Sequence, residues 1–223
     1  MFEDWGYDRR GCGLTAVFHG PAGTGKAMAA GVLARELGFE LYRVDVARLL
    51  ARPAGETEHL LEELFAAAED GRFMLLLGEL DALQTRRLPA VARDLDRVLD
   101  YLARRIDAFE GIAILSARCA AAVAPALDRL AVLRLRFPVP DEALRTQLWA
   151  AQLSPQIPTA GKLDLTALAR RFALSGGDIR DCAVRAAFLA AQDGAALGQA
   201  HLERAVLLEI RDRRKRPHSG PLD

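Results

Sequence analysis

A glycine-rich stretch near the N-terminus constrains this chain more than any other feature. It runs from His19 to Ala27 (HGPAGTGKA), after an apolar run at 14–18 and before a helical pattern at 28–37. A loop of this kind between a strand and a helix turns several backbone N–H groups toward one point, where the helix N-terminus adds partial positive charge. Lys26 is one of few lysines in an arginine-rich chain, which favours a compact point charge there. The stretch therefore predicts a phosphate-binding loop.

The stretch matches the motif G-x-x-x-x-G-K-[ST] in every letter except the last. The last letter is Ala27, which has no hydroxyl group to hold magnesium. A glycine turn that only caps a helix is the alternative, with a prior of about one in twenty. The residues expected to bind the phosphates are Gly20, Pro21, Ala22, Gly23, Thr24, Gly25, Lys26 and Ala27.

Composition narrows the class of protein. With 223 residues, 51% of them hydrophobic, the chain can bury a core as one domain or as one domain with a small appendage. Lys+Arg and Asp+Glu both number 30, so no overall basic field draws nucleic acid or an anionic membrane. The cysteines are too few and scattered for a disulfide framework or a zinc site. No apolar run reaches the ~20 residues that span a bilayer, and the N-terminus lacks a signal-peptide core. We expect a cytoplasmic protein that binds neither nucleic acid nor membranes, and we assign no metal ligands.

Apolar periodicity alternates between strand and helix over the first part of the chain. Continuous apolar runs such as 73–77 are typical of strands buried on both faces of a parallel sheet. The alternation predicts a three-layer α/β/α domain with a parallel, doubly wound sheet. Strands are expected at 14–18, 40–46, 73–77, 112–115 and 131–137, and helices at 26–37, 57–69, 89–109 and 122–130.

Two prolines at 138 and 140 end this alternation, and Asp141 can cap a new helix. Helical patterns follow at 141–152, 164–173, 177–192 and 198–214. We expect an α/β domain over 1–138, a small helical domain over 139–214 and a flexible tail over 215–223. The basic run at 211–216 is interpreted as a solvated helix end.

The end of the strand at 73–77 is the expected place for acidic chemistry. Phosphate-loop enzymes usually carry two carboxylates at such a place, one that supports magnesium and one that polarises the attacking water. Glu79 stands at the water-polarising position, whereas Gly78 replaces the magnesium-side carboxylate. A surface role for Glu79, at the start of a loop, has a prior of about one in three.

These features together resemble the AAA+ ATPases. The resemblance rests on the phosphate loop, the run LLLGELDAL, the strand 112–115, the corner 137–141 and the helix start 175–180, in the order of the family and over roughly residues 11 to 210. It implies an α/β P-loop domain with a helical lid, binding of ATP or ADP, and assembly into rings, usually hexamers, that remodel or thread protein partners. A narrower likeness is to bacterial members found with phage-tail-like contractile injection systems.

The resemblance also suggests roles for residues outside the loop. Glu79 matches the catalytic glutamate, and Arg129 matches one of two arginines offered to the neighbouring subunit's ATP, while Leu130 replaces the other. Arg118 stands where the family has an asparagine that senses the γ-phosphate. Pro53 replaces the aromatic residue of the first pore loop, which is expected at 52–56.

In the lid, Gly176 and Gly177 resemble the family's small pair, and Gly177 is expected at the nucleotide. Arg180 is expected either to face the nucleotide or to form a salt bridge on the helix surface.

The departures concentrate at positions that handle magnesium, the γ-phosphate or substrate. Losing both magnesium-locating groups, at Ala27 and Gly78, predicts hydrolysis slowed by about a hundredfold or more. ATP binding depends mainly on the loop amides and Lys26, so ATP remains the expected cofactor. Magnesium has weaker support, although phosphates and water alone can hold it. The favoured function is a ring subunit with impaired hydrolysis, the alternative is an active remodelling ATPase, and a small-molecule kinase is disfavoured by the C-terminal place of the helical domain.

Overall fold

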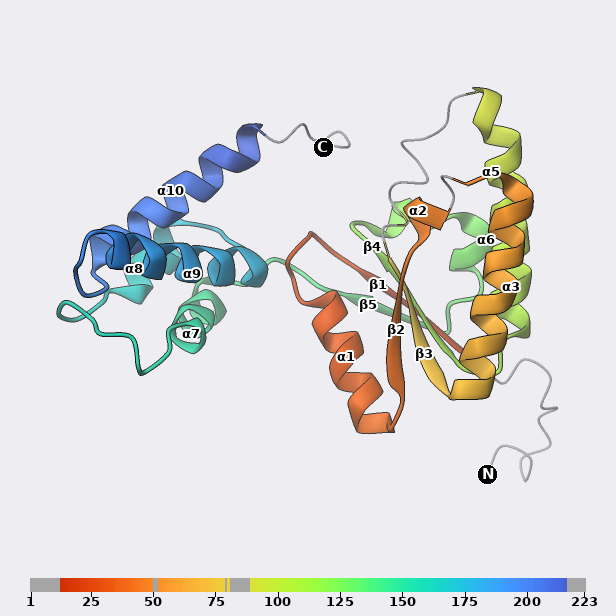
Figure 1. Cartoon of the computed structure of the whole chain (residues 1–223), viewed down its shortest axis with the longest axis horizontal. Coiled ribbons are helices and arrows are strands. Elements are labelled where there is room, and N and C mark those ends of the chain that lie inside the picture. The colour runs from red at the N-terminus through yellow and green to blue at the C-terminus, as the bar shows by residue number, and fades with distance from the viewer. Residues whose placement is uncertain (1–12, 50–51, 79, 81–88, 216–223) are drawn as a thin grey trace. The chain divides into compact units, whose positions relative to one another are not determined.

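The computed structural model describes residues 13–49, 52–78, 80 and 89–215. The chain forms two compact units, shown as ribbons in Figure 1. The first contains residues 13–20 and 26–137, and the second contains 21–25 and 138–215. The tip of the phosphate loop thus belongs, by its contacts, to the second unit.

A parallel sheet forms the centre of the first unit. Its strands stand in the order β2-β3-β4-β1-β5, and every neighbouring pair is parallel. This arrangement confirms the predicted P-loop type of α/β fold. The strands are β1 (Leu14–His19), β2 (Glu40–Asp45), β3 (Phe73–Gly78), β4 (Ile112–Ala117) and β5 (Leu133–Arg136).

Helices cover both faces of this sheet (Figure 1). On one face α1 (Lys26–Leu37) packs through Ala30 and Ala34 against Phe18 and Met74. On the other face α3 (Ala54–Gly71), α5 (Pro89–Ala108) and α6 (Pro125–Asp128) enclose the larger core. Successive strand residues point to opposite faces, so the continuous apolar runs of β1 and β3 supply both cores.

Two short helical elements complete the first unit. After β2 the chain makes α2 (Val46–Leu49), and after β4 it makes the 3₁₀ turn η2 (Ala120–Ala122). The helix expected at 122–130 is therefore a 3₁₀ turn followed by the short α6. Pro125 explains the break, because the residue before a proline is disfavoured in helical conformation and proline itself suits a helix start.

The second unit is helical. It contains α7 (Glu142–Gln152), α8 (Leu165–Arg171), α9 (Gly176–Gln192) and α10 (Gln199–Lys215). Asp141 caps α7 by accepting a hydrogen bond from the backbone N–H of Leu144 at 2.8 Å, as predicted. A separate apolar core holds this unit together, with Trp149, Ile179, Cys182, Leu202 and Val206 at its centre. Within the described residues, no helix is both long and apolar enough to cross a bilayer.

Candidate functional site

The phosphate loop connects the end of β1 to the start of α1. Gly20, Gly23 and Gly25 all have positive φ, at 150°, 75° and 99°. At Gly20 an added Cβ would lie 2.0 Å from the carbonyl oxygen of Phe137, so backbone packing excludes a side chain there. The glycines of the motif are therefore needed for a path that larger residues do not follow.

Hydrogen bonds within the loop fix its shape. The Lys26 ammonium donates to the carbonyl oxygen of Gly20 at 2.5 Å, and the Thr24 hydroxyl donates to that of Pro21 at 2.8 Å. The backbone N–H of Gly20 donates to the carbonyl of Ala117 on β4 at 3.1 Å. A lysine cation and the N-terminus of a helix thus occur together at the end of β1, which is a suitable electrostatic setting for phosphate.

The start of α9 contacts the tip of the loop. The backbone N–H of Gly177 donates to the carbonyl of Gly23 at 2.8 Å. An added Cβ on Gly177 would lie 3.0 Å from the Cα of Gly23, and an added Cβ on Gly23 would lie 2.3 Å from the Ser175 hydroxyl oxygen. The structure therefore brings Gly177 to the phosphate loop, while its role toward nucleotide remains a prediction.

The two magnesium-side positions have no polar side chain. Ala27 is the second residue of α1, and Gly78 is the last residue of β3. An added Cβ at Gly78 would find its nearest neighbour among the described residues, the carbonyl of Val44, at 3.7 Å, which is an ordinary van der Waals contact. Opposite Gly78 on β2, the Asp45 carboxylate is already paired with Arg48 at 3.2 Å.

The predicted catalytic Glu79 lies outside the described residues, directly after β3. In the part of the chain that the structure describes, no three His, Cys, Asp or Glu side chains gather in a way that could hold a metal ion. Leu80, the next described residue, is fully buried.

Arg118 follows β4 directly and is exposed. Its neighbour Ala117 is opposite His19 of β1 and accepts the hydrogen bond from Gly20. Because carboxyl ends of parallel strands meet at one edge of a sheet, Arg118 and the phosphate loop leave the same edge. This placement is compatible with the predicted γ-phosphate contact, which stays a prediction.

Arg129 follows the short helix α6 and is held there by an arginine clamp. Arg134 on β5 donates to the carbonyl oxygens of Asp128 at 2.6 Å and of Ala131 at 3.2 Å, and it also contacts the Asp128 carboxylate at 3.2 Å. The clamp fixes the turn that carries the predicted trans-acting arginine.

A pocket of about 310 Å³ lies beside this turn, and neither the pocket nor the clamp was predicted from the sequence. The residues that line the pocket are Asp100, Ala103, Arg104, Asp107, Arg129 and Leu130. An arginine six residues after an aspartate is too common a pattern to have revealed the clamp.

The stretch expected as a pore loop is largely helical. Ala54 begins α3, three residues before the expected start, and Pro53 is its N-cap residue. Thr57 donates from its hydroxyl to the carbonyl of Leu49 at 2.9 Å and fixes this start. Only the first residues of 52–56 therefore remain as loop.

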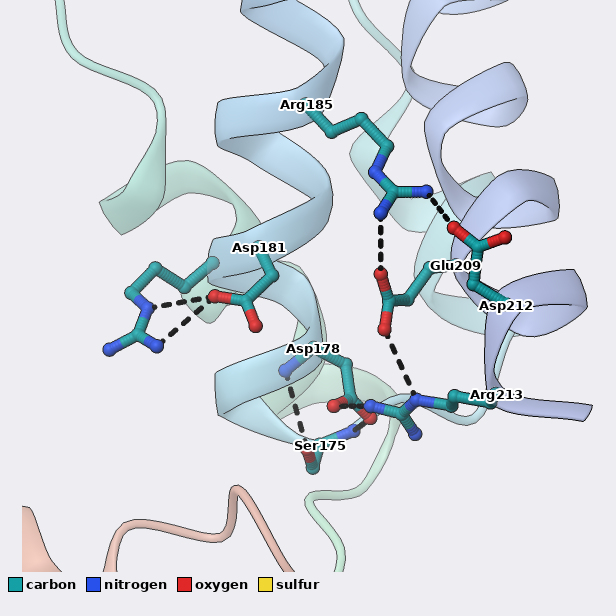
Figure 2. A network of polar contacts seen from close by, with 8 residues as sticks. Ser175, Asp178, Asp181, Arg185, Glu209, Asp212 and Arg213 are labelled. Atoms are coloured by element: carbon teal, nitrogen blue, oxygen red, sulfur yellow. Dashed lines mark hydrogen bonds and ion pairs between the residues drawn. The ribbon is translucent and has the colours of Figure 1, made fainter. Parts of the chain in front are cut away.

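In the basic run at the end of α10, Arg211 and Arg213 are exposed, as expected for a solvated helix end, and Arg213 also takes part in a polar network. Arg213 forms ion pairs with Asp178 and Glu209, two carboxylates that are 6% and 7% exposed (Figure 2). Arg180 pairs with Asp181 at 3.1 Å, which is the surface salt bridge expected as one of the two alternatives for Arg180.

Cys182, the next residue along α9, is buried. Its burial raises the pKa of the thiol from 9.0 to about 12.

Comparisons with known proteins agree with this geometry. Residues 16–140 match the ATPase family associated with various cellular activities (AAA). The 26S proteasome subunit RPT4 of Saccharomyces cerevisiae is 27% identical over 188 residues, which cover 79% of this chain and 43% of that protein. The peroxisomal ATPase PEX1 of Cricetulus griseus is 30% identical over 161 residues, which cover 69% of this chain and 12% of that protein.

A bacterial relative is the ATP-dependent zinc metalloprotease FtsH 3 of Sphaerobacter thermophilus. It is 29% identical over 197 residues, which cover 84% of this chain and 40% of that protein. The chain thus spans less than half the length of each of these three relatives.

Proposed function

This chain belongs to the AAA family of ATPases, and we propose that it is a nucleotide-binding ring subunit in which ATP hydrolysis is impaired. The observation that supports this proposal is a contrast within one site. The phosphate loop keeps its glycines, its lysine and its hydrogen bonds, whereas the two positions that locate magnesium are Ala27 and Gly78.

The loop fits the phosphates of ATP or ADP. A Cβ at Gly20 or Gly23 would meet other atoms at 2.0 and 2.3 Å, so the cradle depends on the absence of side chains. Loop amides and the N-terminus of α1 would hold phosphate oxygens, and the Lys26 ammonium would exchange its carbonyl partner for the β- and γ-phosphates. Bound magnesium would stabilise the charge that develops on the γ-phosphate during hydrolysis.

This chain provides little for magnesium. The methyl group of Ala27 has no oxygen to offer, Gly78 has no side chain, and Asp45 pairs with Arg48. Glu79 remains as the proposed group that polarises water. We expect hydrolysis slowed by about a hundredfold or more relative to a chain with both groups, because each 1.4 kcal/mol of lost stabilisation is tenfold in rate.

The test combines binding and hydrolysis on one sample. A fluorescent ATP analogue is titrated with and without magnesium, and phosphate release is measured in parallel. We expect binding that is nearly independent of magnesium, turnover of about 0.01 per second or less, and loss of binding in Lys26→Ala. Magnesium-dependent turnover near one per second, a typical ATPase rate, would refute impaired hydrolysis and support the alternative, an active ATPase that remodels proteins.

A restored variant sharpens the test. Ala27→Thr with Gly78→Asp returns both magnesium-side groups, and a Cβ at Gly78 makes no contact closer than 3.7 Å with the described residues. We expect this double variant to gain magnesium-dependent hydrolysis over the parent chain. No gain in a variant that still binds ATP would show that the two substitutions are not what limits hydrolysis.

We further propose that Arg129 acts in a ring, on ATP bound to a neighbouring AAA subunit, in the cytoplasm. The exposed turn after α6 and its fixation by Arg134 support this role. Arg129→Ala should lower any activity that depends on assembly and leave the nucleotide affinity of the monomer unchanged. An equal loss of affinity in the monomer would exclude the trans role.

A further inference from the structure

An arginine in the last turn of α10, Arg213, pairs with a buried carboxylate in the first turn of α9 and with a second buried carboxylate on α10. Asp178 on α9 and Glu209 on α10 are 6% and 7% exposed. The Arg213 guanidinium pairs with the Asp178 carboxylate and approaches that of Glu209 at 3.4 Å (Figure 2). From the other side Arg185 approaches Glu209 at 3.4 Å and Asp212 at 2.8 Å. A buried carboxylate is costly without a cation, so the pairing with Arg213 offsets the cost of burying the Asp178 carboxylate.

Asp178 is also half of the capping box that starts α9. Its carboxylate accepts a hydrogen bond from the Ser175 backbone N–H at 3.0 Å, and the Ser175 hydroxyl accepts one from the Asp178 backbone N–H at 3.3 Å. Between these residues, Gly177 directs its own N–H to the carbonyl of Gly23 in the phosphate loop, at 2.8 Å. The capping box therefore sets the direction of the one helix-start N–H that contacts the loop.

We propose that Arg213 is a positioning residue for the phosphate loop, acting through Asp178 and the capping box on Gly23. Without the Arg213 cation, the buried carboxylate would turn toward water, and the first turn of α9 would loosen. The loop would then have to be ordered at the moment of binding, which weakens nucleotide affinity. An unpaired carboxylate near the loop would also repel the phosphates. This inference rests on the proposed binding of nucleotide at the loop.

The other end of α9 offers a matched control. There Arg204, also on α10, lies 3.8 Å from Asp193, the C-cap residue of α9, and both side chains are largely exposed. Both pairs join the same two helices through an arginine and an aspartate. The two pairs differ in burial, because Asp178 is 6% exposed whereas both side chains of the Arg204 pair are exposed. Only the pair of Arg213 lies beside residues that contact the phosphate loop, so hydrogen exchange of the loop, rather than affinity alone, separates a positioning role from a purely structural clamp.

The experiment measures the affinity of the full chain for a fluorescent ADP analogue. Arg213→Ala should weaken binding by roughly 2- to 30-fold, the range found when residues that link two sites are changed. Arg204→Ala should leave affinity within about twofold, and Arg213→Lys should recover part of the loss because it keeps the charge. Asp178→Asn combined with Arg213→Ala should lose less than the sum of the two single losses, since the two residues act on one path.

Hydrogen exchange of the peptide covering residues 20–26, without nucleotide, is the second readout. Arg213→Ala should exchange faster there than the parent chain, and Arg204→Ala should not. A folded Arg213→Ala variant with unchanged affinity and unchanged exchange would overturn the inference. If the parent chain binds no nucleotide, the proposed function fails, and the exchange measurement alone decides whether Arg213 orders the loop.

Discussion

Replacing Gly23 by alanine tests whether the contact between the phosphate loop and α9 stabilises the second unit. Gly23 has φ of 75°, where an alanine costs about 1–2 kcal/mol. The new Cβ would lie 2.3 Å from the Ser175 hydroxyl oxygen, which would have to rotate away. Ser175 would then lose its hydrogen bond to the Asp178 N–H, at a cost of about 1 kcal/mol for a lost N-cap. The sum is a loss of about 2–3 kcal/mol.

Replacing Gly161 by alanine measures the backbone cost of a positive φ separately from the loss of the Ser175 hydrogen bond. Gly161 also belongs to the second unit, its φ is 78°, and an added Cβ would meet no atom within 4 Å. Gly161→Ala therefore carries only the backbone cost of about 1–2 kcal/mol. Since 1 kcal/mol lowers the melting temperature by about 2–4 °C in a chain of this size, Gly23→Ala should melt about 2–4 °C below Gly161→Ala.

The assay is thermal unfolding followed by tryptophan fluorescence. In a Trp5→Phe background, the remaining indole is the fully buried Trp149, which reports on the second unit. Affinity for the fluorescent ADP analogue is measured on the same variants, and only Gly23→Ala should lose it. Equal melting temperatures for the two variants would refute the reasoning, because they would show that the Ser175 contact contributes nothing beyond the backbone term.

Three further predictions concern the second unit. Cys182 should react with a maleimide at pH 8 far more slowly than the exposed Cys119, because its pKa of about 12 keeps the thiol protonated at that pH and burial shields it; mass spectrometry after digestion locates the label. Trp149→Ala should destabilise by about 3–5 kcal/mol. Trp149→Phe should cost much less, because the indole N–H has no hydrogen-bond partner among the described residues and its removal offsets lost contact area; both are compared by urea unfolding. Asp141→Ala should lower the melting temperature by about 2–4 °C through loss of the N-cap of α7.

The apolar periodicity of the sequence predicted most helices and strands, because each of them buries a face that its own residues define. The run at 73–77 is apolar on both faces, and only a central strand of a parallel sheet satisfies both faces. Where boundaries were wrong, tertiary pairing or proline was the cause. Strand β4 extends to Ala117 because Ser116 and Ala117 pair with Phe18 and His19 of β1, which the local apolar run at 112–115 could not indicate.

The residues of the candidate site could be predicted from the sequence only where they lie in one continuous segment. The glycine pattern and Lys26 lie in one loop, so their spacing in the sequence is also their arrangement in space. The pairing of Asp178 with Arg213 depends on how α9 packs against α10, and the sequence shows each residue only as part of a charged helix. The spacing of Glu209 and Arg213, four residues apart, did indicate an ion pair along α10. Such pairs are common on solvated helices, so the spacing does not indicate that Glu209 is buried.

The glycines of the phosphate loop and the glycine at the end of β3 differ in how closely neighbouring atoms surround them. At Gly20 and Gly23 a side chain would collide with neighbouring atoms, so the shape of the loop depends on these residues. At Gly78 an added Cβ would be in ordinary contact with its nearest described neighbour, at 3.7 Å, so the described backbone does not exclude a Cβ there. Packing therefore requires Gly20 and Gly23 whether or not nucleotide is bound, and their presence alone does not test the use of the site. The restored pair Ala27→Thr and Gly78→Asp is therefore the variant that tests the proposed impairment of hydrolysis, because it changes neither of the glycines on which the shape of the loop depends.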